Sequence, residues 1–200
     1  LARPGAARVV RPLLAGERAR FVGEAIAVAV AKDRYAAEDA AEAVEIAYRE
    51  LNGVPSIEAA TAPDAPELHP GQPNVIFCEE HEVGDPDAKF AEADIVIERT
   101  FHSPRYNAAP MEGRGVLAVP EGDGIILWSS TQIPHIVEET VADLLGAKVT
   151  VRCPDIGGGF GQKAHVFPEE VVVAWLALRL GRPVKWVEDR VENMLTSSHA

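Results

Sequence analysis

The sequence has few cysteines and no long apolar segment, and each shortage excludes a class of protein. Its only two cysteines, Cys78 and Cys153, are far apart and not in a Cys-x-x-Cys arrangement, so we interpret them as reduced thiols of a cytoplasmic protein. An iron–sulfur cluster on this chain is excluded, because a cluster needs about four cysteine ligands. No run of about 18 apolar residues occurs, which excludes a transmembrane helix.

Basic residues are also scarce relative to acidic ones. The chain carries 19 Lys and Arg against 31 Asp and Glu, which gives a net charge of −12. Nucleic acids and anionic membranes are bound through clustered Lys and Arg, so this balance argues against both as partners. The rest is ordinary: 47% of the residues are hydrophobic and 25% are charged, which is typical of a globular protein that forms a core without disulfides.

Both ends of the sequence lack the signals of a natural terminus. The start, residues 1–5, has neither an initiator Met nor the charged and apolar regions of a signal peptide. The end, residues 195–200, shows no helix stop or tail signature. We therefore expect the sequence to be a segment of a longer chain.

The first 58 residues have a strand–helix pattern. Residues 25–30 form a short apolar run that predicts a strand. Asp33 then precedes a segment from Tyr35 to Leu51 whose apolar residues recur at helical spacing, with acidic residues mostly on the other face. The pattern predicts a surface helix laid on a sheet and ended by Asn52-Gly53.

A Pro-rich segment, residues 59–88, separates this region from the next. It has little hydrophobic periodicity, so we expect an extended linker along the surface, with one strand at most, at residues 74–82. The prolines of the linker and its approach are Pro55, Pro63, Pro66, Pro70, Pro73 and Pro86.

Residues 89–200 alternate strand and helix signals. Apolar runs predict strands at residues 95–101, 116–119, 125–128, 148–153 and 184–187, with a hairpin between the second and third. Pro134 and Pro168 each open a predicted helix, and Gly146 and Gly181 end them. The order indicates an α+β domain that is incomplete at the end of the sequence. The apolar stripe of the first helix consists of Ile136, Val137, Val141, Leu144 and Leu145.

The segment from Asp155 to Lys163 carries the strongest chemical signal. Four of residues 157–161 are glycines, placed between a predicted strand and a predicted helix, where α/β proteins hold ligand loops. Glycines can reach φ > 0 and turn successive N–H groups toward a phosphate, a pyrophosphate or a metal-bound oxygen. The segment matches neither G-x-x-x-x-G-K-[ST] nor G-x-G-x-x-G. The alternative is a flexible turn that binds nothing, but Phe160 among the glycines favours a ring held in a defined place.

A second polar segment, residues 129–135, also lies between a strand and a helix. The side chain of Gln132 can both donate and accept a hydrogen bond, so it could contact a metal-oxo group without adding a charge. The alternative is that the Ser, Thr and Gln side chains simply cap the following helix. His135 is interpreted as a helix-start residue, because no second His or carboxylate stands at metal-ligand spacing from it.

Two charged segments have structural interpretations. Glu112 and Arg114 are predicted to form an ion pair across a tight turn. Residues 187–193 are interpreted as a charged loop or a helix start. No G-x-S-x-G, H-E-x-x-H or Cys–His arrangement is present, so no catalytic triad is predicted.

The order of these segments resembles the first molybdenum-binding domain of the xanthine dehydrogenase family, which includes aldehyde oxidase and aerobic carbon monoxide dehydrogenase. The shared motifs are Pro-Met-Glu-x-Arg-Gly, Ser-Thr-Gln-x-Pro-His, Gly-Gly-Gly-Phe-Gly-x-Lys, Gly-Arg-Pro-Val-Lys-Trp and Glu-Asp-Arg-x-Glu-Asn. Upstream, residues 21–31 and the Ala-rich segment after them resemble the end of that family's a/b hammerhead domain. The resemblance implies the end of a hammerhead domain at residues 1–58, a linker at 59–88 and an incomplete, mixed-sheet molybdopterin-binding domain at 89–200.

The resemblance also implies roles for individual residues. In this family the glutamine of the Ser-Thr-Gln motif lies beside the apical oxo ligand of molybdenum, which implies a cofactor-binding and catalytic role for Gln132, just outside the metal's own ligands. The glycine loop lies against the molybdenum ligands and the pterin. This implies that Gly158, Gly159, Phe160 and Gly161 bind the cofactor, and that Phe160 also has a catalytic role because it lies near the substrate pocket.

An activity follows from the resemblance as well. It implies that the chain is part of the large subunit of a molybdenum hydroxylase, which oxidises an aldehyde, an N-heterocycle or carbon monoxide with oxygen from water. The cofactor would be molybdopterin with molybdenum, usually the cytosine dinucleotide form in bacteria. Electrons would leave through 2Fe-2S clusters on a small subunit and FAD on a medium subunit, in a dimer of heterotrimers.

The family's base glutamate, second molybdenum domain and substrate-selecting loop are expected beyond Ala200. Glu169, Glu170 and Glu188 are not credible substitutes for the base, because helix-start and surface acids are expected at their positions. The segment alone is therefore expected to be inactive. Two alternatives remain: an α+β module that holds a nucleotide phosphate without redox chemistry, and a truncated, inactive remnant.

Overall fold

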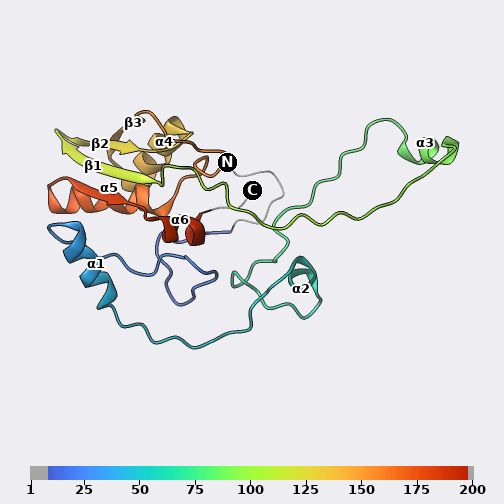
Figure 1. Cartoon of the computed structure of the whole chain (residues 1–200), viewed down its shortest axis with the longest axis horizontal. Helices are drawn as coiled ribbons and strands as arrows, with labels where there is room; N and C mark the ends of the chain where they lie inside the picture. The colour runs from blue at the N-terminus through green and yellow to red at the C-terminus, as the bar shows by residue number, and fades with distance from the viewer. Residues whose placement is uncertain (1–8, 198–200) are drawn as a thin grey trace. The chain divides into compact units, whose positions relative to one another are not determined.

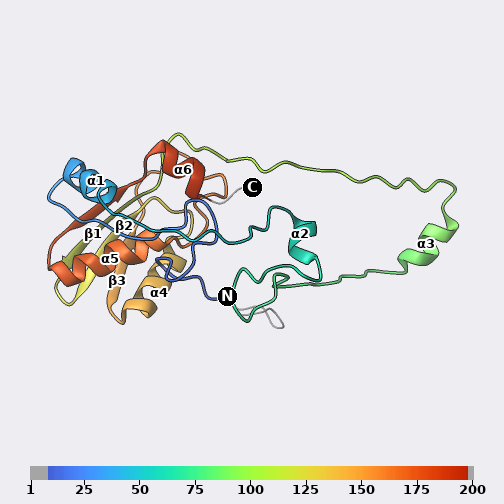
Figure 2. The ribbon, with the colours of Figure 1, turned by 90° about the horizontal axis from the view of Figure 1, so that it is seen from below.

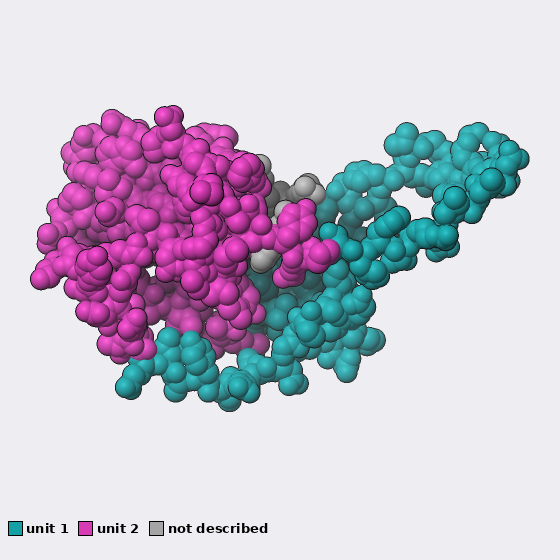
Figure 3. Space-filling model, in the orientation of Figure 1, with its two compact units in different colours: residues 1–11, 45–103 teal, residues 12–44, 104–200 magenta. Residues whose placement is uncertain are grey.

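A computed structural model describes residues 9–197, and these fall into two units. One unit lies within residues 1–11 and 45–103, and the other within residues 12–44 and 104–200 (Figure 3). The second unit contains every strand among the described residues, and it holds all of the predicted site residues. The two units are described separately.

The first unit contains two short helices joined by extended chain. Helix α2 (Ile57–Thr61) begins after Ser56, whose hydroxyl accepts the N–H of Ala59, and α3 (Pro86–Glu92) begins after Asp85. Between them, the carboxamide of Asn74 donates to two backbone carbonyls at 3.1 Å and thereby ties the Pro-rich segment together. The prediction of an entirely extended linker is wrong at both ends of the segment, where local capping signals start a helical turn.

The strands predicted at residues 74–82 and 95–101 are absent from the described structure. Both segments satisfy the local pattern, but a strand is stable only when a neighbour accepts its backbone hydrogen bonds and its side chains are covered. Neither condition holds here, since Ile95 is 80% exposed and Ile97 is 74% exposed. The run at residues 25–30, in the second unit, lacks strand pairing for the same reason.

The Ala-rich helix is shorter than the sequence predicts. Helix α1 (Arg34–Glu42) begins at Asp33, whose carboxylate accepts the N–H of Ala36 at 2.9 Å, and it ends at Ala43 rather than at residue 51. Beyond this point β-branched and aromatic side chains recur at every second position, at Val44, Ile46 and Tyr48. That period of two favours extended chain over helix, so the prediction to residue 51 is wrong.

A four-stranded mixed sheet forms the centre of the second unit. Its strands are β1 (Gly115–Glu121), β2 (Gly124–Ser129), β3 (Lys148–Arg152) and β4 (Val184–Val187), in the order β3-β2-β1-β4. Strand β1 is antiparallel to β2 and β4, whereas β2 and β3 are parallel. The predicted hairpin is confirmed, and Gly122 in its two-residue turn takes the left-handed φ of +60° that such a turn requires.

Two helices cover one face of this sheet (Figures 1 and 2). Helix α4 (Pro134–Leu145) and helix α5 (Pro168–Leu180) begin at the predicted prolines and end at Gly146 and Gly181, both in the left-handed conformation. The predicted apolar stripe of α4 is only partly confirmed, because Leu144 is 59% exposed. The buried core consists of Val116, Ala118, Ile125, Leu127, Val137, Val141, Val149, Val171, Val173, Ala174 and Ala177.

The strand directions bring four loops to one edge of the sheet. Strands β2, β3 and β4 end at this edge, and β1, which runs in the opposite direction, begins there. The loops are therefore the segment before β1, the segment after β2, the glycine loop after β3 and the segment after β4. The last of these leads directly into α6 (Arg190–Thr196), which Asp189 and Glu192 cap in a reciprocal pair of hydrogen bonds.

Candidate functional site

The side chain of Gln132 is held at this edge in one orientation. Its Oε1 accepts the backbone N–H of Gly161 at 3.0 Å. The backbone N–H of Gln132 donates to the carbonyl of Lys163, also at 3.0 Å. Gln132 is exposed, and its Nε2 donates to no group within residues 9–197, so this donor is available to a ligand. The structure thus brings Gln132 and the glycine loop together, as the sequence predicts.

The alternative that this polar segment caps the next helix is wrong. The N-cap of α4 is Ile133, and no side chain caps that end. Thr131 is 2% exposed and its hydroxyl donates to the carbonyl of Lys163, while the hydroxyl of Ser129 donates to Glu170. His135 lies in the first turn of α4, and residues 9–197 contain no group of three or more potential metal-binding side chains.

The glycine loop has an unusual backbone. Gly158, Phe160 and Gly161 have φ values of +98°, +51° and +82°, so even the phenylalanine adopts the left-handed conformation that side chains other than glycine rarely take. Within residues 9–197 the N–H groups of Gly158, Gly159 and Phe160 have no protein acceptor. Three successive donors at an exposed turn with positive φ are the arrangement that binds an anion.

The glycines are also required by close contacts. A Cβ on Gly159 would lie 2.5 Å from both Cδ and Oε1 of Gln132, and one on Gly158 would lie 2.8 Å from the ring of Phe160 and 3.3 Å from Pro110. The ring of Phe160 therefore packs over Gly158 and beside Pro110, yet it remains 70% exposed. The ring is therefore an exposed part of the glycine loop, and the carboxamide of Gln132 lies against the neighbouring Gly159.

The predicted ion pair between Glu112 and Arg114 is wrong, because each of them pairs with a more distant residue. Glu112 Oε2 accepts Nζ of Lys163 at 2.8 Å and the N–H of Gly157 at 2.9 Å. Burial raises the pKa of Glu112, but its hydrogen bonds to Lys163 and Gly157 and the charge of Lys163 together bring it below its ordinary value. Glu112 is therefore an anion that holds the start of the glycine loop.

Arg114 is the centre of a buried cluster of charged side chains, which it forms with Glu188 and Glu169. Its guanidinium donates to Glu188 at 2.6 Å and to Glu169 at 3.1 Å, and it stacks 3.9 Å from the ring centroid of Phe167. Trp186 flanks the guanidinium at 5.3 Å. The side chain of Glu188 is fully buried, so the interpretation of Glu188 as a surface acid is wrong.

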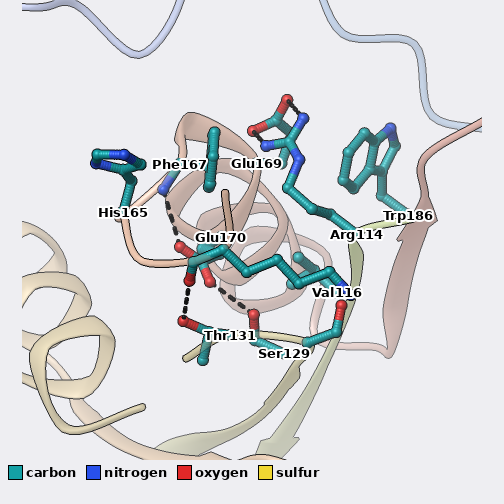
Figure 4. Close-up of a pocket in the computed structure, with 11 residues that line it drawn as sticks. Arg114, Val116, Ser129, Thr131, His165, Phe167, Glu169, Glu170 and Trp186 are labelled. Atoms are coloured by element: carbon teal, nitrogen blue, oxygen red, sulfur yellow. Dashed lines mark hydrogen bonds and ion pairs between the residues drawn. The ribbon is translucent and has the colours of Figure 1, made fainter. Parts of the chain in front are cut away.

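Glu170 is also buried rather than exposed, and it lies in a small pocket beneath the edge (Figure 4). The carboxylate accepts the hydroxyl of Ser129 at 2.6 Å and the N–H of Phe167 at 2.9 Å. Burial raises the pKa of Glu170, and these hydrogen bonds and the charge of Arg114 offset only part of that effect. Neither Gln132 nor Phe160 lines this pocket, so it is separate from the candidate site.

The raised pKa of Glu170 has a measurable consequence. The folded protein binds this proton more tightly than the unfolded chain does, so the wild type gains stability as the pH falls from above the folded-state pKa to the ordinary value of 4.5. Gln at this position cannot ionise, and its amide can satisfy both partners. We expect Glu170→Gln to be most stable relative to the wild type at neutral pH, with the difference shrinking on acidification. Thermal melts of the intact subunit at several pH values test this, and a difference that does not change with pH would contradict it.

Several buried polar residues of the edge were not singled out from the sequence. Lys163 is 1% exposed, Gln162 is 2% exposed and Asn193 is fully buried. Gln162 donates to Asn107 at 2.9 Å, and Asn193 donates to Glu188 at 2.8 Å. The partner of Gln162 is 55 residues away along the chain and that of Lys163 is 51 residues away, so no local spacing predicts these two contacts, whereas Asn193 and Glu188 are only five positions apart.

The chain matches the models of two protein families. The family model of the molybdopterin cofactor-binding domain matches residues 68–200, and the model of the aldehyde oxidase and xanthine dehydrogenase a/b hammerhead domain matches residues 3–52. The chain therefore belongs to the molybdopterin cofactor-binding domain family of aldehyde oxidases and xanthine dehydrogenases, and the predicted family and α+β fold class are confirmed.

Individual relatives agree with the family. The chain is 43% identical to the nicotine 6-hydroxylase large subunit of Paenarthrobacter nicotinovorans, over 98% of this chain and 25% of the relative. It is 38% identical to the carbon monoxide dehydrogenase large chain of Hydrogenophaga pseudoflava, over 98% and 27%. The crystal structure of quinoline 2-oxidoreductase from Pseudomonas putida 86 matches with a TM-score of 0.83 and 40% identity, over 98% of this chain and 26% of that one.

These relatives are much longer than the chain, which spans about a quarter of their length. The relatives' names mark two of them as a large subunit or large chain, so each is one component of an assembly. In residues 9–197 no helix is both long enough and apolar enough to cross a membrane.

Proposed function

We propose that this chain is part of the molybdenum-cofactor-binding large subunit of a molybdenum hydroxylase. The substrate class is an aldehyde, an N-heterocycle or carbon monoxide, oxidised with oxygen derived from water. The observation that carries the proposal is the carboxamide of Gln132, whose oxygen accepts the N–H of Gly161 in the glycine loop and whose Nε2 has no acceptor within residues 9–197. Family membership supplies the chemical context for this geometry.

The residues present fit a molybdopterin cofactor. The group is anionic and rich in oxygen, and the loop offers it the N–H groups of Gly158, Gly159 and Phe160, none of which has an acceptor within residues 9–197. The space above Gly159 is too narrow for a methyl group, since Gln132 lies 2.5 Å from the Cβ position. A side chain there would displace the amide that faces the ligand.

Each residue of the site then has a distinct task. When bound, the molybdenum centre supplies the two-electron oxidation. Gln132 would donate a hydrogen bond through Nε2 to an oxygen of the cofactor without adding a charge. Gly158, Gly159 and Gly161 would allow the backbone to approach the cofactor. Phe160 would orient the substrate. The proposal assigns no proton transfer to Glu169, Glu170 or Glu188, because each is engaged in hydrogen bonds away from the loop.

The proposal includes partners and a compartment. We expect an iron–sulfur small subunit carrying 2Fe-2S clusters and a medium subunit carrying FAD, joined in a dimer of heterotrimers. The pterin would be the cytosine dinucleotide form. Cys78 and Cys153 are both free thiols, which supports a cytoplasmic location for the assembly.

The test is to purify the intact protein and to measure its molybdenum and pterin content. Stoichiometric metal with a pterin would support the proposal. A metal-free protein that binds nucleotides would favour a phosphate-binding module instead. Sequencing the downstream DNA would show whether the reading frame encodes the second molybdenum domain. A reading frame without that domain would mean that the protein is a catalytically inactive remnant.

Gln132 provides the sharpest test of the site assignment. Gln132→Ala removes the donor toward the cofactor, so we expect turnover to fall by a factor that corresponds to about 1–3 kcal/mol, with the melting temperature nearly unchanged. Gln132→Glu is the matched variant, because it keeps an acceptor for the N–H of Gly161 but loses the NH2 donor. Equal losses in both variants would assign the effect to the donor. Wild-type turnover in Gln132→Ala would show that this amide has no role in catalysis.

A further inference from the structure

Lys163 connects three of the four loops at the edge of the sheet. Its Nζ donates to Glu112 in the segment before β1, at 2.8 Å. Its backbone carbonyl accepts the N–H of Gln132 at 3.0 Å and the hydroxyl of Thr131 at 3.3 Å, both in the segment after β2. Lys163 itself belongs to the end of the glycine loop after β3, so a single residue fixes the spacing of all three segments.

Glu112 completes this connection from the opposite side of the loop. Its Oε2 accepts the N–H of Gly157, and its own N–H donates to the carbonyl of Gly157 at 3.2 Å. The pair Glu112–Lys163 therefore anchors the glycine loop at both of its ends. One end is Gly157, which Glu112 binds, and the other is Lys163 itself. Between these two anchors lie the donors that face the ligand and the N–H of Gly161 that orients Gln132.

The burial of the pair is asymmetric. The side chain of Lys163 is fully buried, whereas that of Glu112 is 41% exposed. A buried ammonium that loses its partner is costly, but a half-exposed carboxylate that loses its partner is still solvated. Replacing the lysine is therefore the gentler way to break the pair, and it leaves Glu112 able to accept the N–H of Gly157.

We propose that Lys163 and Glu112 are positioning residues that set the distance between the glycine loop and Gln132, and so set the spacing of the groups that would contact the cofactor. Neither needs to touch the cofactor or the substrate for this. The inference rests on the proposed function for the identity of the ligand, but the positioning itself concerns hydrogen bonds within this chain.

The test uses Lys163→Met in the intact subunit, since methionine keeps most of the length and flexibility of the side chain without its charge. Amide hydrogen exchange, followed by mass spectrometry, is read over residues 155–164 and 129–133, and molybdenum content is measured on the same samples. We expect amide exchange in both segments to become about tenfold faster. This is the factor that follows when the free energy of local unfolding falls by the contribution of one hydrogen bond. Molybdenum content should fall in parallel.

Two further variants make the result specific. Val173→Ala creates a cavity in the core at a side chain of α5 that is 4% exposed and takes no part in the hydrogen bonds of Lys163 or Glu112. It should lower the melting temperature without changing exchange in the two segments. Glu112→Gln keeps an oxygen that can accept from both Lys163 and Gly157 and loses only the charge, so it should accelerate the same segments by a smaller factor, and it serves if Lys163→Met does not fold. Unchanged exchange in the folded lysine or glutamate variant, or equal acceleration in Val173→Ala, would overturn the positioning role. A wild-type protein without molybdenum would instead refute the proposed function and leave the exchange result interpretable.

Discussion

Gly159→Ala should lower the molybdenum content of the intact subunit by about tenfold or more while its melting temperature changes little. The added Cβ would lie 2.5 Å from Cδ and Oε1 of Gln132, a separation that no adjustment of a few tenths of an ångström relieves. The carboxamide must rotate away, which breaks its hydrogen bond to Gly161 and removes its donor from the ligand. Losses of about 1–3 kcal/mol in such contacts correspond to roughly a 5- to 150-fold loss of affinity.

The cause can be separated from a general effect on the loop. In a Gln132→Ala background the obstacle is gone, so Gly159→Ala should add little further loss of metal. Gly161→Ala is different, because its Cβ would meet open space and only its φ of +82° opposes the substitution. Gly181→Ala is the matched control for that backbone cost, since it also has a positive φ and open space but lies at the end of α5. A Gly159→Ala protein with full metal content would refute the proposed contact between this loop and the cofactor.

The second large effect is expected on stability, from Arg114→Met. This substitution leaves the fully buried carboxylate of Glu188 without its cation and removes the partner of Glu169. Breaking a buried ion pair from one side typically costs about 3–5 kcal/mol of unfolding free energy, because the remaining charge is neither paired nor hydrated. The guanidinium also stacks on Phe167, so its loss removes packing as well as charge.

Urea denaturation of the intact subunit, followed by a probe of this domain such as Trp186 fluorescence, measures the effect. Lys148→Met is the control, because its pair with Asp123 is 77% exposed on both sides and should contribute less than about 1 kcal/mol. The double variant Arg114→Met/Glu188→Leu should recover part of the loss, since it removes the unpaired charge. A similar small effect in Arg114→Met and Lys148→Met would show that the buried cluster contributes little to stability.

The sheet and its two covering helices could be predicted from the sequence because their signals are local. Pro134 and Gly146 mark the ends of α4, and a two-residue turn of Gly122 and Asp123 joins two apolar runs. The strands predicted at residues 25–30 and 95–101 have equally good local patterns. They did not form because pairing depends on a neighbouring strand, and a pattern within one segment carries no information about that neighbour.

The candidate site was predicted to a similar extent. Gln132 and the glycine loop were identified from their own residue types, and the structure brings them together. The contacts of charged residues were not, because Glu112 was assigned to the arginine two positions away rather than to Lys163, 51 positions away. In a folded chain the partner of a buried charge is chosen by the topology of the sheet, whereas the sequence displays only its neighbours along the chain.

The order β3-β2-β1-β4 also determines when the four loops at this end of the sheet can come together during synthesis. Strand β1 has β2 beside it almost at once, but its other neighbour is the last strand made, and Arg114 waits for a carboxylate 74 residues further on. At about 5–20 residues per second, the ribosome needs roughly 4–15 seconds to add them. Throughout that interval the side of β1 that faces β4 is unpaired and open to other chains. Both sides of β1 are therefore paired, and the loops at this end of the sheet complete, only after β4 has been synthesised.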